Sequence, residues 1–102
     1  MKDKVYTIEE IKSNLYEILK NTEVKTVTLF GSYAKNKATS KSDIDLIIDS
    51  EKKIMGFKLF SLISKIEDTF KKEVDAFEKS EIIKNSQIYN EIRKTGVVVY
   101  ER

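Results

Sequence analysis

The sequence lacks both cysteine and histidine. These absences exclude disulfides, thiol nucleophiles, zinc sites built on cysteine or histidine, and serine-histidine-aspartate triads. Any catalysis must therefore use carboxylates, lysines, hydroxyls, backbone groups or a hard metal ion.

Long hydrophobic runs and an excess of charge of one sign are missing as well. The longest apolar run is four residues, Val97 to Tyr100, too short for a membrane-spanning helix or the core of a signal peptide. Nineteen basic and seventeen acidic residues leave a net charge of +2, and only Arg93 and Arg102 are arginines. Such a balance argues against nucleic-acid reading by charge or by arginine forks. We expect a cytoplasmic protein with no membrane and no direct nucleic-acid partner.

The chain also lacks proline and has only three glycines, each between periodic segments. No stretch resembles a linker, so we expect a single domain over residues 1–102. Thr7 and Glu10 form a capping box, and the apolar residues that follow predict a helix that ends at Asn21. Similar spacing predicts helices over residues 55–71 and 80–94. Strand patterns cover residues 24–30, 43–49, 74–77 and 97–100.

This alternation of helices and strands indicates an α/β domain. We expect a small mixed sheet with amphipathic helices packed mainly on one face, which leaves the other face open. Aspartates alternate along the strand over residues 43–49 and point to that open face.

Asp43 and Asp45 are the first candidates for chemistry. Side chains two residues apart on a strand project to the same face, about 6–7 Å apart. Two such carboxylates repel each other, and a divalent cation between them reverses that repulsion. Oxygen ligands without histidine or cysteine suit Mg²⁺ or Mn²⁺. Alone, however, the pair also fits two solvated acids on an exposed strand.

Gly31 and Ser32 lie shortly before these aspartates, at the end of the strand over residues 24–30. Glycine lets the backbone approach a ligand, and the amides after it and the Ser32 hydroxyl can bind phosphate oxygens. Lys35, Lys37 and Lys41 follow and could neutralise a polyphosphate. Taken singly, Gly31-Ser32 is more typical of an ordinary turn, and the lysines are more typical of a solvated loop.

Together they form Gly31-Ser32, ten residues, and then Asp43-Ile44-Asp45. This pattern resembles the signature of the DNA polymerase β-like nucleotidyltransferase superfamily. The stretches Leu29 to Lys35 and Ser42 to Asp49 resemble its minimal, single-domain bacterial and archaeal members. The resemblance covers nearly the whole chain and implies the polymerase β-like nucleotidyltransferase fold.

The resemblance also implies the site residues. Asp43, Asp45 and a third carboxylate would be catalytic and bind metal, with two Mg²⁺ ions expected and Mn²⁺ as the alternative. Asp75 is the candidate third carboxylate. Glu73 shares its face but starts the strand, and Asp49 suits a turn or a helix N-terminus.

The nucleotide-binding residues implied are Gly31, Ser32, Lys35 and Ser42. Many members have Arg-Gly where this chain has Lys35-Asn36. Lysine keeps the charge without the planar fork, and asparagine tolerates left-handed backbone.

The resemblance implies an enzyme, a protein adenylyltransferase that moves AMP from ATP to a tyrosine hydroxyl. Minimal members commonly accompany a toxin with a HEPN (higher eukaryotes and prokaryotes nucleotide-binding) domain. The expected role is thus that of an antitoxin that forms a hetero-oligomer with this toxin. Two alternatives remain: transfer to a small hydroxyl compound, and a non-catalytic antitoxin that blocks the toxin by binding.

Overall fold

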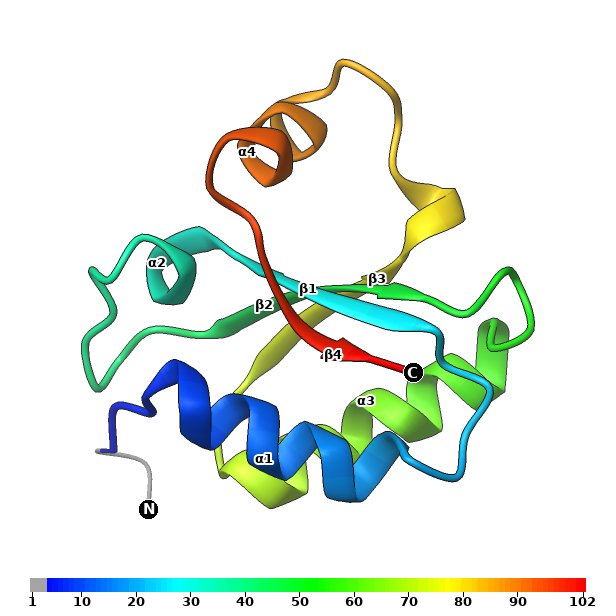
Figure 1. The fold of residues 1–102 in the computed structure, drawn as a ribbon, viewed down its shortest axis with the longest axis horizontal. Helices are drawn as coiled ribbons and strands as arrows, with labels where there is room; N and C mark the ends of the chain where they lie inside the picture. The colour runs from blue at the N-terminus through cyan, green and yellow to red at the C-terminus, as the bar shows by residue number, and fades with distance from the viewer. Residues whose placement is uncertain (1–3) are drawn as a thin grey trace.

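The computed structural model describes residues 4–102, so the first three residues of the expected domain lie outside it. A four-stranded sheet is flanked by helices on both faces, with α1 and α3 on one and α4 on the other (Figure 1). The predicted α/β class with a small mixed sheet is confirmed. The elements in chain order are α1 (Ile8–Leu19), β1 (Thr26–Phe30), α2 (Gly31–Ala34), β2 (Ile44–Asp49), α3 (Gly56–Phe70), β3 (Val74–Glu78), the 3₁₀ helix η1 (Lys79–Glu81), α4 (Gln87–Thr95) and β4 (Val97–Glu101).

The strand order is β3-β2-β1-β4, so β2 and β1 are the central strands of the sheet and β3 and β4 form its edges. β1 is antiparallel to both β2 and β4, whereas β3 runs parallel to β2. A parallel pair needs a crossover connection, and α3 supplies it between β2 and β3. Asp45 pairs with Phe30 of β1 and with Asp75 of β3, so three strands meet at the candidate site.

The hydrophobic core lies between the sheet and the two long helices. Burial of each large apolar side chain contributes about 1.5–3 kcal/mol, which holds the layers together. No helix within residues 4–102 is long and apolar enough to cross a membrane. The strands supply the fully buried Val27, Leu29, Leu46 and Ile48, and the helices supply Ile11, Leu15, Leu19, Ile66 and Phe70.

The capping box at the start of α1 forms as predicted. The Thr7 hydroxyl accepts a hydrogen bond from the Glu10 amide at 3.0 Å, and the Glu10 carboxylate accepts one from the Thr7 amide at 2.9 Å. Two amide donors that the helix itself leaves unpaired are thereby satisfied. The side chains of Ile11, Leu15 and Leu19 then face the core.

The segment over residues 80–94, predicted to be one helix, is divided in the structure. Only η1 and, after a turn, α4 are helical. Ile82 is extended after η1, and Asn85 is left-handed with φ of 66°. The Ser86 hydroxyl then accepts a hydrogen bond from the Tyr89 amide at 3.2 Å and starts α4. The left-handed turn at Asn85 and the hydrogen bond that the Ser86 hydroxyl accepts therefore outweigh the helical spacing of the apolar residues.

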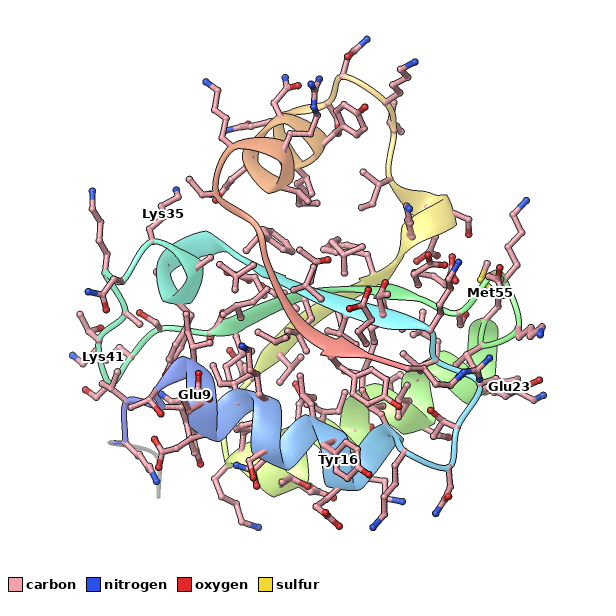
Figure 2. All side chains as sticks on the ribbon, viewed as in Figure 1. Glu9, Tyr16, Glu23, Lys35, Lys41 and Met55 are labelled. Carbon is pink, nitrogen blue, oxygen red and sulfur yellow. The ribbon has the colours of Figure 1, made fainter. Side chains whose placement is uncertain are left out.

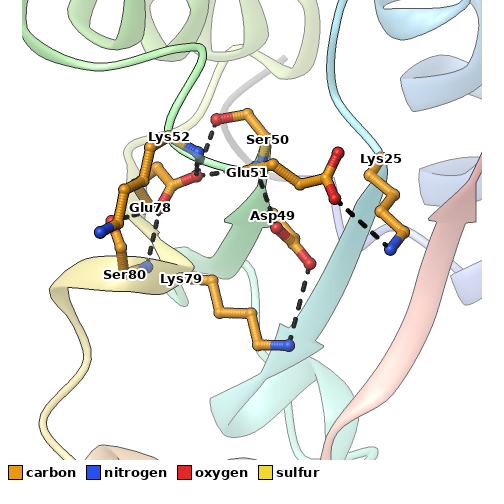
Figure 3. A network of polar contacts seen from close by, with 8 residues as sticks. All are labelled: Lys25, Asp49, Ser50, Glu51, Lys52, Glu78, Lys79 and Ser80. Atoms are coloured by element: carbon orange, nitrogen blue, oxygen red, sulfur yellow. Dashed lines mark hydrogen bonds and ion pairs between the residues drawn. The ribbon is translucent and has the colours of Figure 1, made fainter.

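A buried carboxylate fixes the ends of β2 and β3 relative to each other (Figure 3). Glu78 is 1% exposed and accepts hydrogen bonds from the Ser50 amide at 3.0 Å and the Ser50 hydroxyl at 2.7 Å. The amides of Lys52 and Ser80 also donate to it, at 3.2 and 2.7 Å. Burial acts to raise the pKa of Glu78, but the hydrogen bonds from Ser80 and Ser50 outweigh it and lower the pKa to about 2. This network supports the register that places Asp45 beside Asp75.

Candidate active site

Gly31 allows a carboxylate to lie directly against the backbone where β1 passes into α2. Its φ is +75°, a left-handed conformation that glycine adopts at little cost. A Cβ atom at this position would collide with the Asp45 carboxylate. Glycine is therefore required twice here, once for the turn and once for the close approach of Asp45. The residue after it, Ser32, is half-buried within α2.

Asp45 and Asp75 lie side by side on the sheet face below α4 (Figure 1). Together with Asp43 and Glu91, whose charges also act on Asp45, they form what we call the acidic cluster. Asp45 is partly buried on β2, and Asp75 is exposed beside it on the parallel strand β3. Burial, followed by the charges of Asp75, Asp43 and Glu91 and a hydrogen bond with Asp75, raises the pKa of Asp45 to about 6. In the metal-free protein, burial and the neighbouring negative charges therefore disfavour the ionised form of Asp45.

The acidic cluster fits a hard divalent cation, although its ligands are only partly assembled. Within residues 4–102, no three acidic side chains lie close enough together to form a complete metal site. Asp45 and Asp75 are adjacent, whereas Asp43 lies one residue before β2 begins. Carboxylate oxygens are the donors that Mg²⁺ and Mn²⁺ prefer, and a cation would relieve the repulsion that raises the pKa of Asp45.

Two of the predicted nucleotide-binding side chains have partners in the structure. The Lys35 ammonium lies 3.1 Å from a carboxylate oxygen of Glu91. The Ser42 hydroxyl accepts a hydrogen bond from the Thr39 amide at 2.9 Å and so closes the loop before Asp43. Asn36, at the position where the family resemblance implies glycine, has a φ of 60° and adopts a left-handed conformation.

Glu91 is a residue near the site that sequence reasoning missed. It lies on α4, and its charge contributes to the raised pKa of Asp45. No spacing motif connects it with Asp45, because the turn between η1 and α4 decides where it points. Its only sequence signal is that it is the single acidic residue of α4.

The other acids on this sheet face have different surroundings. One Asp49 carboxylate oxygen accepts a hydrogen bond from the Glu51 amide at 3.1 Å, and the other lies 3.8 Å from the Lys79 ammonium. Asp49 thus serves a turn, as predicted. Glu73 is exposed and precedes β3. The register leaves Asp75 as the β3 carboxylate beside Asp45.

A cleft of about 400 Å³ lies between α4 and the open face of the sheet. Ile47 lines it from β2, and Ile82, Tyr89 and Ile92 line it from the segment that crosses this face. Ile47 shares the sheet face of Asp45, two residues away, so the cleft adjoins the acidic cluster. The site therefore combines the glycine turn at Gly31, neighbouring carboxylates and an adjacent apolar cleft.

Comparison with known proteins agrees with this geometry. The family model for polymerase beta nucleotidyltransferases matches residues 10–102. A candidate protein adenylyltransferase of Methanocaldococcus jannaschii, MJ0128, is 37% identical over 97 residues, which cover 91% of this chain and 98% of that protein.

Two solved structures share the fold at low sequence identity. A chain of a toxin–antitoxin complex with AMP-PNP superposes with a TM-score of 0.74 at 17% identity, over 89% of this chain and 73% of that one. A chain of a complex between tri-AMPylated Shewanella oneidensis HEPN toxin and MNT antitoxin has a TM-score of 0.69 at 15% identity, over 94% of this chain and 74% of that one.

Enzymes of the matching family use divalent metal ions. The chain belongs to the polymerase beta nucleotidyltransferase family.

Proposed function

We propose that this protein is an Mg²⁺-dependent protein adenylyltransferase and the antitoxin of a HEPN-domain toxin. It would transfer AMP from ATP to a tyrosine hydroxyl of that toxin. The observation that carries the proposal is the pairing of Asp45 with Asp75 against the backbone of Gly31. Carboxylates thus lie beside the Gly31 turn, which would receive the triphosphate.

The relatives support both the reaction and the partner. MJ0128 is named as a candidate protein adenylyltransferase. One structural relative was solved with AMP-PNP, an ATP analogue, and another holds an AMPylated HEPN toxin. Residues 1–102 would form a single minimal domain, which is too small to enclose both a nucleotide and an acceptor. A partner protein that carries the acceptor would supply the part of the binding site that this domain is too small to form.

The residues of this chain divide the work of binding and proton transfer. Ser32, Lys35 and the amides after Gly31 would hold the triphosphate, with Ser42 shaping the loop beside it. Asp43 and Asp45 would hold two Mg²⁺ ions, with Mn²⁺ as the alternative, and Asp75 would share one of them. Bound metal would neutralise the phosphates and lower the pKa of the attacking hydroxyl.

The transfer itself is an in-line displacement. The acceptor oxygen forms a bond to the α-phosphorus while the bond from that phosphorus to pyrophosphate breaks. Asp75 would accept the proton of the acceptor hydroxyl, since the chain has no histidine to do so. Positioning and charge neutralisation supply most of the acceleration.

Labelled ATP tests the proposal directly. The protein is incubated with α-labelled ATP, Mg²⁺ and a candidate HEPN toxin, and the label is followed on protein and on small molecules. Label on a toxin tyrosine is expected. Label on a small molecule would instead identify a small hydroxyl acceptor, and toxin neutralisation without label would identify a binding-only antitoxin. Asp68→Asn, on the exposed surface of α3, is the matched control for Asp43→Asn and should transfer normally.

A further inference from the structure

Helix α4 is weakly attached to the rest of the molecule. None of its residues is buried, although it packs over β1 and beside α2. Within residues 4–102, the Lys35–Glu91 ion pair is the only ion pair or side-chain hydrogen bond that joins α4 to a residue outside residues 85–95. A single polar contact thus connects α4 to Lys35, the residue that follows α2.

This ion pair lies where a ligand can reach it. The two side chains are 40% and 29% exposed, and both line an open hollow of about 560 Å³. Figure 2 shows Lys35 at the end of α2, on the side of the molecule where α4 lies. Glu91 is also close enough to the acidic cluster to raise the pKa of Asp45. The pair therefore lies near both the predicted phosphate site and the carboxylates.

We propose that Glu91 is a positioning residue that holds Lys35 until a nucleotide triphosphate takes Lys35 in exchange, which unfastens α4 from α2. The inference rests on the proposed function, because it assumes a triphosphate near Gly31. A triphosphate carries more negative charge than one carboxylate and competes well for a lysine. A partly exposed ion pair is weak enough for that exchange to occur.

The exchange gives α4 two states, one with the Lys35–Glu91 ion pair and one without it. With Lys35 bound to Glu91, α4 is fastened over the cleft that Ile47, Tyr89 and Ile92 line. With Lys35 on a phosphate, α4 keeps only its packing against β1 and α2. Nucleotide binding would thereby loosen the helix beside the acidic cluster before the acceptor arrives.

Calorimetry with Mg²⁺ and AMP-PNP on the whole chain tests the exchange without an acceptor. Glu91→Gln should tighten binding about two- to fivefold, the range that a partly exposed ion pair supports. Lys35→Met should weaken binding, and in the Lys35→Met background Glu91→Gln should have little effect. Glu51→Gln is the matched control, because Glu51 pairs with Lys25 at 3.8 Å away from the site and should leave binding unchanged.

A second measurement follows α4 itself. Amide hydrogen exchange in residues 87–95 should become faster when AMP-PNP binds the parent protein, and Glu91→Gln should show that faster exchange without nucleotide. In transfer assays, the same variant should lower KM for ATP more than it changes kcat.

Several results would overturn the inference. Weaker nucleotide binding by Glu91→Gln would mean that Glu91 holds Lys35 in its binding position or binds metal. Equal tightening with and without Lys35 would show a general charge effect. Failure of the parent to bind Mg²⁺ and AMP-PNP would overturn the nucleotide site and this inference together, whereas normal binding with an inert Glu91 would overturn the inference alone.

Discussion

At the scale of single residues, the site depends on close contacts between charged groups and backbone. Asp45 lies against Gly31, beside Asp75 and within the field of Glu91. Burial and the charges of Asp75, Asp43 and Glu91 disfavour the charged form of Asp45 in the metal-free protein. A bound cation would remove this electrostatic repulsion, so the repulsion favours the metal binding that we propose.

Asp45→Asn should abolish nucleotidyl transfer while it stabilises the metal-free protein above pH 6. The pKa of Asp45 is raised from 3.8 to about 6, so its contribution to stability is complete below pH 3.8 and is lost as pH rises through 6. Asparagine avoids that loss. We expect a gain of about 1–2 kcal/mol at pH 8, after a discount for solvent screening.

Denaturant unfolding at pH 4 and pH 8 without divalent metal measures this gain. A variant that is equally stable at both pH values relative to the parent would contradict the electrostatic origin of the shift. A large loss of stability at pH 8 would mean that Asp45 is structural.

Gly31→Ala should lose transfer activity and at least about 1 kcal/mol of stability. Alanine is strained at a φ of +75°, and its Cβ displaces the Asp45 carboxylate. Gly56→Ala is the matched control, because Gly56 has a φ of +56° with open space around the added atom. It should lose a similar strain energy yet transfer normally. Equal activity of the two variants in the labelled-ATP assay would show that the contact with Asp45 is unimportant.

At the scale of elements, the parallel pairing of β2 with β3 decides which acids meet. The Glu78 network ties the ends of both strands to the loop after Ser50, at the end of the sheet away from Asp45 and Asp75 (Figure 3). A shift of one residue in this register would turn Asp75 to the core side. The network thus supports the site from a distance.

Glu78→Gln should destabilise the protein by about 3 kcal/mol at pH 7 and flatten its acid unfolding curve. The pKa of Glu78 is lowered from 4.5 to about 2, so its contribution is present above pH 4.5 and is lost as pH falls toward 2. Thermal unfolding between pH 2 and pH 7 measures this slope. Glu23→Gln, a change at an exposed position before β1, is the comparison. Parallel curves for parent and Glu78→Gln would contradict the assignment.

At the scale of the whole molecule, the sheet face that carries Asp45 and Asp75 is covered by only one helix, the short α4, whereas two long helices cover the other face (Figure 1). The long helices α1 and α3 cover the other face and form the core with it (Figure 1). This division leaves the acidic cluster accessible to an acceptor from another protein.

Asp75→Asn should keep most Mg²⁺-ATP binding and lose nearly all transfer to the toxin at pH 7. The triphosphate would be held mainly by Ser32, Lys35 and the metal on Asp43 and Asp45, whereas Asp75 would serve the acceptor hydroxyl. Transfer should partly recover toward pH 10, where a tyrosine with an ordinary pKa ionises unaided. A small alcohol acceptor would show no such recovery. If the variant transfers as fast as the parent at pH 7, Asp75 is not the third carboxylate, and Glu73 becomes the candidate for that role.

The sequence by itself determined the fold class, the capping box of α1 and the family. Their signals are local: apolar periodicity, the Thr7–Glu10 spacing, and the fixed interval between Gly31-Ser32 and Asp43-Ile44-Asp45. Residues close in sequence adopt predictable relative directions on a strand or helix, so such patterns can be read without coordinates. The role of Asp49 in a turn followed from the same reasoning.

Only the tertiary structure decided how distant segments meet. It divided the segment over residues 80–94 and brought Glu91 to Lys35 and Asp45. It also buried Glu78 beneath the loop after Ser50 and placed the Asp45 carboxylate where a side chain on Gly31 would stand. These contacts depend on strand register and on the path of a turn, which arise from the balance of burial and hydrogen bonding over the whole chain rather than from any local pattern.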